Sequence, residues 1–358
     1  MSEQLPPLST AGSVPPDPDH PAPLQRSGSR PGGPAGRRPG LPGRGLGRDV
    51  GLVVALAALC VVGVATAGDR FASVDNVLTI LRLAAVYGVL AVGMTFVITG
   101  GGIDLSVGSV LGLASVWAST LATQTMAQET HWLVMVSTAL LVGTACGVVN
   151  GVLIAYGKVV AFIATLAMLV AARGLAEIIA NRRTQVVNVR SFLDVFRGDV
   201  LGVPVLVWLF ALVALAGWFL LNRTTFGRRT VAVGGNPEAA RLAGIKVQRH
   251  TTYLYALSGL TAGIAAVMML ARTTAGSSTN GQLYELDAIA MVVVGGTLLA
   301  GGRGTIVGTV FGVLIFSTLT NVFVQNDLST SVQAIAKGAI IVVAVLLQQR
   351  LAVRSRSS

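Results

Sequence analysis

The sequence predicts an all-α polytopic membrane protein with about ten transmembrane helices, and three observations support this fold class. Of its 358 residues, 53% are hydrophobic and only 11% are charged, whereas about 25% charged residues is usual for a soluble domain. The charged residues are crowded into a few segments, so that long stretches such as 132–156 contain none. Such a stretch can span a hydrocarbon core of about 30 Å, which takes roughly 20 helical residues.

The first 48 residues differ in composition from the rest of the chain. Eleven of the thirteen prolines fall between Pro6 and Pro42, mixed with glycine, serine and arginine. Such a segment cannot form a packed core, so we expect residues 1–48 to be a disordered cytoplasmic tail. A signal peptide is the alternative, but the tail is too long and the apolar run after it continues into further spans. The transmembrane domain then covers residues 49–350, and residues 351–358 form a second cytoplasmic tail.

Ten apolar segments of the transmembrane domain are candidate spans. They are residues 50–67, 83–99, 105–124, 132–155, 159–180, 202–221, 252–271, 288–301, 304–325 and 333–349. An even number of spans places both chain ends on one side, and because both ends are rich in arginine, that side should be the cytoplasm. The loop 181–200 disagrees, since it falls outside yet holds four arginines. The short segment 288–301 is also compatible with a broken or half-crossing helix.

The net charge of +11 does not indicate a nucleic-acid partner. The arginines lie in tails and connecting loops rather than on a basic face with aromatic residues, and positive-inside orientation in a lipid bilayer explains them. Cys60 and Cys146 lie in apolar runs without metal or redox spacing and are predicted to be packing residues.

Glycines shape the helices and reveal an internal repeat. Gly143, Gly147 and Gly151 recur every fourth residue, as do Gly304, Gly308 and Gly312, and each set predicts a flat strip for close helix packing. The segments "GGIDLSVGSVLGL" from Gly101 and "GGRGTIVGTVFGV" from Gly301 share one frame 200 residues apart. Weak internal symmetry of this kind is typical of transporters. The predicted packing and seam residues are Gly101, Gly102, Asp104, Ser106, Gly108, Gly301, Gly302, Gly304 and Gly308.

Asp104 lies at the start of the third span, at helical spacing with Gly108. We expect it either to be the N-cap of that span, accepting backbone N–H bonds, or to be a polar anchor where the glycine strip meets its neighbour. Direct contact with a transported solute or a proton is the alternative.

Other candidate chemistry is sparse. Arg173 and Glu177 are four residues apart inside the fifth span, and because a charge at membrane depth is costly, we predict that they form an intramembrane ion pair, with a role in translocation as the alternative. Lys337 is predicted to extend its amine to the interface. No metal site, nucleophile with a base, or P-loop is recognisable, since Gly157-Lys158 lacks a following serine or threonine. We therefore expect no catalytic, metal or cofactor site in this chain.

The longest connection, 222–250, is basic yet patterned, with six basic residues against Glu238 alone. In "GGNPEAARLAGIKV", Pro237 fits a first helical position, Glu238 fits the first turn, and Gly244 marks the end. We predict a short helix with an apolar face, suited to contact with a soluble partner. A solvated connector is the alternative.

Four segments together resemble bacterial ABC-importer permeases of the ribose/xylose/galactose class. They are "TGGGIDLSVGSVLGL", "VVAFIATLAML", "FGRRTVAVGGNPEAARLAGIKV" and "YELDAIAMVVVGGTLLAGGRGTIVGT". The similarity runs from about residue 50 to the end in the same order, whereas the proline-rich tail and one extra glycine in the first motif depart from the family pattern. The resemblance implies a type II ABC importer-like fold. It assigns the family's ATPase-coupling helix to this loop, with Gly235, Asn236, Glu238, Ala239, Ala240 and Gly244.

The resemblance also implies partners and a location. We expect a homo- or heterodimer of permease chains in the bacterial plasma (inner) membrane, with two cytoplasmic ATPase subunits that bind ATP and Mg, and an extracytoplasmic sugar-binding protein. The function implied is ATP-driven import of a monosaccharide. A branched-chain amino-acid or other small polar solute permease, a proton-driven secondary transporter relying on Asp104 and Glu177, and a non-transporting receptor are the alternatives. Since no span carries a dense polar cluster, sugar selectivity is expected to depend mostly on the binding protein.

Overall fold

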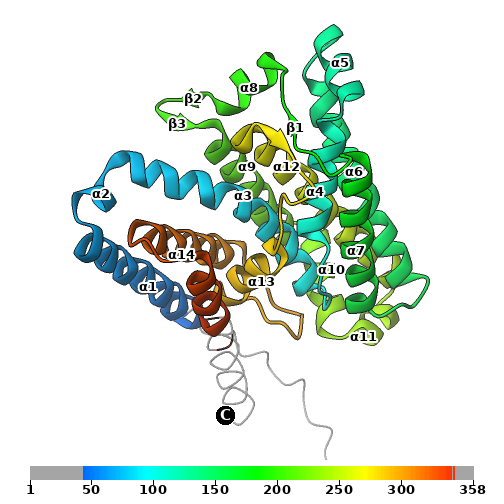
Figure 1. Cartoon of the computed structure of the whole chain (residues 1–358). Coiled ribbons are helices and arrows are strands. Elements are labelled where there is room, and N and C mark those ends of the chain that lie inside the picture. Colours follow the sequence, from blue (N-terminus) through cyan, green and yellow to red (C-terminus); the bar gives the residue numbers. More distant parts are fainter. Residues whose placement is uncertain (1–42, 341, 343–358) are drawn as a thin grey trace, which may run out of the picture. The chain divides into compact units, whose positions relative to one another are not determined.

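The computed structural model describes residues 43–340 and 342 and is shown in Figure 1. The part of the predicted tail before residue 43, and the whole second tail 351–358, lie outside the described residues. The helices are α1 Gly43–Ala67, α2 Asp69–Ala72, α3 Val74–Thr99, α4 Val107–Ala118, α5 Leu121–Glu129, α6 Leu133–Ala155, α7 Ala161–Ile179, α8 Arg190–Arg197, α9 Val205–Arg223, α10 Thr225–Gly235, α11 Pro237–Leu242, α12 Val247–Thr273, α13 Tyr284–Val294 and α14 Ile306–Gln325. Residues 330–340 are also helical.

Strands are limited to two short antiparallel pairs in the described part of the chain. β1 (Gln185–Val186) pairs with β4 (Ala275–Gly276), and β2 (Asp199–Val200) pairs with β3 (Val203–Pro204). The predicted all-α class is confirmed.

Seven helices of the described chain are long and apolar enough to cross a membrane, so the chain is a multi-pass membrane protein. These are the Val50–Ala67 part of α1, and α3, α6, α7, α9, α12 and α14. Their ends agree with the predicted spans to within a few residues, except that α3 begins at Val74 rather than at residue 83. The tenth predicted span, 333–349, is helical as far as residue 340 and then leaves the continuously described region.

Two predicted spans are not continuous helices, because helix-ending residues interrupt them, and for the segment 288–301 this agrees with the broken helix expected as the alternative. The third, 105–124, is broken after Ala118, where the Ser119 hydroxyl donates to the carbonyl of Ser115 and Thr120 becomes the N-cap of α5. The eighth, 288–301, is replaced by the 11-residue α13, which ends at Gly295. Gly296 then takes a left-handed φ of 87° that favours glycine.

Two predicted loop boundaries also change. α1 begins at Gly43, directly after the last proline of the tail, so its first turns lie inside the segment 1–48 that was predicted to be disordered. The connection 222–250 is mostly helical, since α10 and α11 lie within it and α12 begins at Val247.

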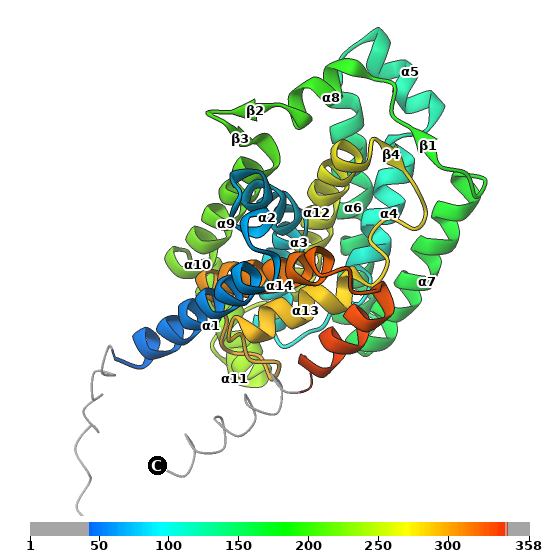
Figure 2. The ribbon, with the colours of Figure 1, turned by 60° about the vertical axis from the view of Figure 1, so that its left-hand side comes forward.

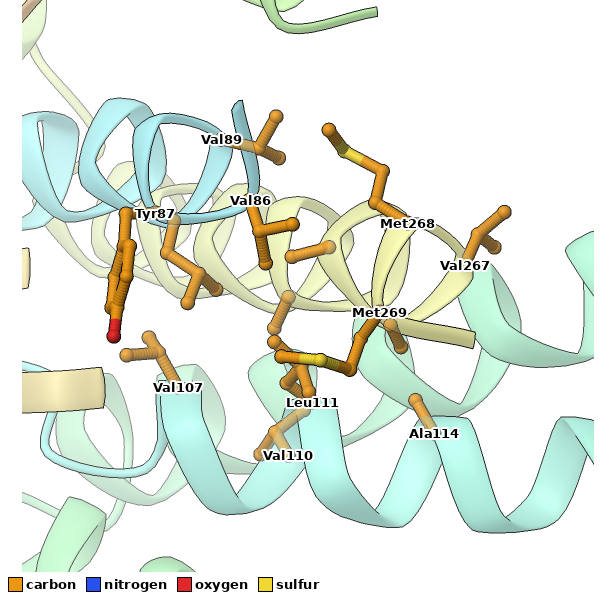
Figure 3. Packing of buried hydrophobic residues seen from close by; sticks show 14 of the residues in the cluster. Val86, Tyr87, Val89, Val107, Val110, Leu111, Ala114, Val267, Met268 and Met269 are labelled. Atoms are coloured by element: carbon orange, nitrogen blue, oxygen red, sulfur yellow. The ribbon is translucent and has the colours of Figure 1, made fainter. Parts of the chain in front are cut away.

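The core lies where α3, α4 and α12 meet. Val86 and Val89 of α3, Leu111 of α4, and Met268 and Met269 of α12 fill the space between these helices (Figure 3). α3, α12 and α14 are mostly buried, whereas α1, α6, α7 and α9 have few fully buried residues and expose apolar side chains on part of their surface. In a membrane, the exposed apolar faces are suited to contact with lipid. Cys60 is exposed on α1, so its predicted packing role is wrong, while Cys146 packs against the core.

The glycine strip of α6 packs against α12, as the spacing predicts. A Cβ atom on Gly143 would lie 2.8 Å from the backbone nitrogen of Gly263, and one on Gly151 would lie 2.7 Å from the Cα of Thr252. Such distances leave no room for a side chain, so the two backbones approach as closely as glycine permits.

Candidate functional site

The two halves of the internal repeat meet at Gly101 and Gly301. Both residues have left-handed φ angles, 84° and 80°, and both donate their N–H to the carbonyl three residues earlier, in Ile98 and Leu298, at 2.9 Å. A Cβ on Gly301 would lie 2.8 Å from the Cα of Gly101. The equivalent turns of the repeat therefore touch backbone to backbone, and we call this contact the repeat seam.

Gly234, at the end of α10, is a third member of the repeat seam. A Cβ on Gly301 would lie 2.7 Å from the carbonyl oxygen of Gly234, and one on Gly302 would lie 2.9 Å from the Cα of Gly235. The N–H of Gly302 also donates to the carbonyl of Thr99 at 2.9 Å. Because α11 follows Gly235 after a single residue, the segment that carries α11 is packed directly on the repeat seam.

Gly102 and Gly304, two further glycines of the predicted set, lie directly against neighbouring side chains, where a Cβ would not fit. A Cβ on Gly102 would lie 2.5 Å from the hydroxyl oxygen of Tyr255, and Gly304 lies against the side chain of Thr99. Gly304 precedes α14, so it is not part of a helical strip as predicted.

Gly108 and Gly308, which are equivalent in the repeat, each face a glycine of another segment. Gly108 in α4 lies against the backbone of Gly281, and Gly308 in α14 lies against the carbonyl of Gly295. Gly312 continues the α14 strip against Met291. The two repeat helices thus use the same glycine for contact with different partners.

Asp104 is buried and accepts three hydrogen bonds. Its Oδ1 accepts from the backbone N–H of Ser106 at 3.0 Å and from the Ser106 hydroxyl at 2.6 Å, and its Oδ2 accepts from the hydroxyl of Ser258 in α12 at 2.8 Å. Ser106, not Asp104, is the N-cap residue of α4. Asp104 therefore accepts a backbone N–H just before the helix and also links the α3–α4 turn to α12.

The hydrogen-bond network extends to α6. Asn150 donates its Nδ2–H to the hydroxyl oxygen of Ser106 at 2.9 Å, and Tyr255 donates its hydroxyl to the carbonyl of Ile103 at 3.2 Å. Asn150, Tyr255 and Ser258 are buried. They were missed as site residues in the sequence, although single polar residues inside apolar runs were the available signal.

The structure does not form the predicted ion pair between Arg173 and Glu177. The guanidinium of Arg173 donates through Nη1 to the carbonyl oxygens of Ser278 and Asn280, the latter at 2.9 Å. Glu177 instead lies 3.5 Å from Nε of Arg182 in a largely exposed pair. Backbone carbonyls of a distant segment accept hydrogen bonds from the partly buried guanidinium, and this kind of partner cannot be recognised from side-chain spacing.

Lys337 also has a partner that the sequence did not indicate. Its Nζ lies 3.2 Å from Oδ2 of Asp287 in α13, and both side chains are mostly buried. An extended amine at the interface is therefore not its role in this structure.

The predicted short helix of the 222–250 connection is confirmed as α11. Asn236 is its N-cap and accepts the N–H of Ala239 at 3.0 Å, and Pro237 occupies the first helical position. Gly244 ends it with a φ of 82°, and the N–H of Ile245 donates to the carbonyl of Ala240 at 3.0 Å. This bond satisfies a carbonyl that the helix end would otherwise leave free.

One side of α11 is anchored and the other is exposed. Ala240 is buried, whereas Leu242 is 77% exposed although it is a large apolar residue. Glu238 accepts from Nε of Arg241 at 3.1 Å, and this bond, together with the positive charge, lowers the pKa of the Glu238 carboxyl. A hollow of about 730 Å³ lies beside the helix, lined by residues of α11, the start of α12 and Tyr156. The exposed apolar side and the hollow form a surface suited to contact with another protein.

Comparison with known protein families identifies the family to which the chain belongs. Residues 76–345 match the family described as the permease component of the branched-chain amino acid transport system. This range contains both halves of the repeat, the Asp104 network and α11. The chain belongs to this permease family. No solved structure matches the permease.

Relatives of the permease carry the names of sugar importers. The permease is 40% identical to the ribose import permease protein RbsC of Haemophilus influenzae, over 83% of this chain and 90% of that protein. It is 41% identical to RbsC of Escherichia coli K12, over 83% and 92% of the two chains. It is 34% identical to the xylose transport system permease protein XylH of Escherichia coli K12, over 82% and 90%.

Proposed function

We propose that this permease is the membrane-spanning subunit of an ATP-driven importer for a monosaccharide such as ribose, xylose or galactose. The observation that carries the proposal is the similarity to ribose import permeases, which extends over 83% of the chain at about two identical residues in five. On this proposal the chain hydrolyses no ATP itself. Cytoplasmic ATPase subunits bind ATP and Mg, and an extracytoplasmic binding protein delivers the sugar. Two permease chains form a homo- or heterodimer in the bacterial plasma membrane, with both termini in the cytoplasm.

In the proposed mechanism, α11 is the contact through which ATP binding reaches the membrane domain. ATP closes the two ATPase subunits, and the closing motion moves α11 with Glu238, Ala239 and Gly244. Support comes from the packing of Gly234 and Gly235 on Gly301 and Gly302, since contact between backbones leaves no flexible side chain between α11 and the repeat seam. Displacement of α11 would then shift the two repeat halves relative to each other and change the side to which the path opens.

Transport in proteoliposomes tests the proposed function. The permease is reconstituted with the ATPase and binding protein from neighbouring reading frames, and uptake of labelled ribose, xylose and galactose is measured with and without ATP. We expect ATP-dependent uptake of at least one of these sugars that survives an uncoupler. Uptake driven by a proton gradient without ATP, or no flux of any solute with all components present, would overturn the proposal.

A branched-chain amino-acid permease is the second candidate, because the matching family is described by that substrate. Leucine, isoleucine and valine are therefore tested as substrates in the same vesicles. ATP-dependent uptake of these amino acids without uptake of sugar would favour this candidate.

A further inference from the structure

A non-helical segment lies inside the helical domain, between α12 and α13. Residues 274–283 leave α12 at Thr273 and reach α13 at Tyr284 without forming a helix that continues either one. Figure 2 shows this segment in yellow as it passes α4 on its way to α13. A Cβ on Gly276 would lie 2.8 Å from the carbonyl of Ser115, and Gly281 lies against Gly108 in the first turn of α4. The segment therefore follows α4 through the apolar part of the domain.

On the inner side of this segment, which faces α4 and α7, side chains form hydrogen bonds with the segment's polar groups. Arg173 of α7 donates to the carbonyls of Ser278 and Asn280. Asn280 donates its Nδ2–H to the hydroxyl of Ser115 at 3.2 Å and to the carbonyl of Ala275 at 3.2 Å. The bonds from Arg173 explain why a guanidinium lies inside the mostly apolar helix α7.

The outer side of the segment is exposed and carries polar side chains beside one apolar residue. Thr279 and Gln282 are exposed, as is Arg272 at the end of α12, and Leu283 is 57% exposed. The side chains of Arg272 and Gln282 form no hydrogen bond to any other residue in the described part of the chain. Irregular backbone at membrane depth is tolerated only where it is buried in protein or lines a water-filled cavity. Since polar and charged side chains are exposed on this side, lipid is not a suitable environment for it.

A cavity on this side has the composition of a site for an uncharged polyol. It measures about 270 Å³, and its lining includes Arg272, Thr279, Asn280, Gln282 and Tyr284, close to the lower end of about 300 Å³ for small-molecule pockets. Guanidinium and amide groups offer neighbouring donors and acceptors that match adjacent hydroxyls. The Tyr284 ring, which packs on the ring of Tyr87 at a centroid distance of 4.3 Å, adds apolar surface for the C–H side of a sugar ring. Among the described residues, no carboxylate lines the cavity.

We propose that residues 274–283 line the water-filled path of the permease, and that Arg272 and Gln282 bind the hydroxyls of the passing sugar beside the ring of Tyr284. This inference rests on the proposed function for the identity of the solute. It assigns part of the sugar selectivity to the permease, because the polar cluster lies between two helices rather than along one span.

Accessibility to water tests the path without any need for sugar transport. In a Cys60→Ala, Cys146→Ala background, Gln282→Cys is exposed to a water-soluble maleimide in open membranes, with the full complex assembled. We expect labelling as fast as for Gln128→Cys, an exposed glutamine at the end of α5. Leu212→Cys in α9, which is 62% exposed and apolar, should label slowly. If Gln282→Cys labels as slowly as Leu212→Cys, the segment faces lipid or a second chain and the proposal is wrong.

Uptake and protection test the sugar contact. Gln282→Ala should raise the half-saturating concentration of sugar-loaded binding protein or lower uptake by about fivefold to tenfold, as expected for lost hydrogen bonds. The matched variant Gln128→Ala should transport like the unsubstituted chain. Sugar with its binding protein should slow the labelling of Gln282→Cys but not of Gln128→Cys. Normal uptake by Gln282→Ala together with unprotected labelling would overturn the contact. Absence of sugar uptake in the unsubstituted complex would instead overturn the proposed function, while the labelling result would still decide whether the path is there.

Discussion

At the residue scale, the Asp104 network and the glycines of the repeat seam are the features with the clearest consequences. Both oxygens of Asp104 have donors, so the buried carboxylate is held by Ser106 and Ser258 rather than left free for a solute. This arrangement supports a structural role. The glycines are needed because they have no side chain. A Cβ at Gly301 would overlap the backbone of two other segments.

We predict that Asp104→Leu will destabilise the permease far more than Asp104→Asn. The asparagine keeps an acceptor for the N–H of Ser106, whereas leucine leaves three buried donors without a partner, for a loss of about 2 to 4 kcal/mol. Thermal aggregation of the purified protein measures the difference. The exposed aspartate Asp69, changed to leucine, is the control. An Asn variant that assembles normally but fails to transport would contradict the structural role.

We predict that Gly301→Ala will be more harmful than Gly202→Ala, although both positions have left-handed φ angles of 80° and 75°. Gly202 has open space around the position of a Cβ, so its substitution adds only backbone strain of about 1 to 2 kcal/mol. Gly301 adds overlap with Gly234 and Gly101, for about 1 to 3 kcal/mol more. Thermal stability and ATP-dependent uptake of the two variants provide the comparison. Equal effects would mean that crowding at the repeat seam is unimportant.

At the element scale, the interrupted helices are explained by residues that compete with helix continuation. Ser119 and Thr120 end α4 and begin α5, and Gly295 and Gly296 end α13. The non-helical segment 274–283 is stabilised by a residue of another helix, since Arg173 of α7 donates a hydrogen bond to the carbonyl of Asn280. Short helices and an unwound segment of this kind are where transporter sites tend to lie.

We predict that Arg173→Met will destabilise the permease by about 1 to 3 kcal/mol, because two partly buried backbone carbonyls lose a charged donor. Glu177→Gln should change stability by less than about 0.5 kcal/mol, since its partner Arg182 is exposed. Denaturant titration in detergent measures both. Equal losses of stability in the two variants would instead support the ion pair between Arg173 and Glu177 that the spacing predicts.

For α11, we predict that Leu242→Asp and Gly244→Val each reduce co-purification of the ATPase subunits by about tenfold. The first change places a charge on the exposed apolar side, and the second forces a β-branched residue into a left-handed φ of 82°. Leu201→Asp, at an exposed leucine between β2 and β3, is the control and should bind normally. If both α11 variants bind the ATPase subunits and take up sugar as well as the unsubstituted chain, α11 is not the coupling contact.

The Glu238 carboxyl should not make this contact sensitive to pH near neutrality. Its pKa is lowered by Arg241, so any stability from the pair is present above the ordinary glutamate pKa of about 4.3 and is lost only as the pH falls through the lowered value. Association with the ATPase is therefore expected to change little between about pH 6 and 8 on account of Glu238.

At the scale of the whole molecule, side-chain amides join α3, near the beginning of the described chain, to α14, the last long helix of the described part. Asn76 at the start of α3 and Asn321 in α14 exchange hydrogen bonds of 3.1 and 2.7 Å, and Gln325 adds one of 3.0 Å to the Asn76 oxygen. The pair is buried. It ties together segments that are 245 residues apart.

A double-mutant cycle tests this link. Asn76→Leu alone should cost about 1 to 3 kcal/mol, because it leaves the amide of Asn321 unpaired, while adding Asn321→Leu should cost less than its single effect. Unfolding of the two single variants and the double variant gives the coupling energy. Additive losses would show that the two amides do not depend on each other.

Composition and short-range spacing were enough to predict the membrane class, the positions of the long spans, the helix α11 and the repeat, because each depends on residues within a short window. The glycine spacing of α6 also predicted a close contact, though not that α12 is the partner. The folded structure was needed to find the partners of Arg173 and Lys337, the third glycine of the repeat seam, and the polar side of residues 274–283. These features join residues that are far apart in the chain. Short-range sequence patterns do not predict such contacts, since the contacts form only when the helices pack.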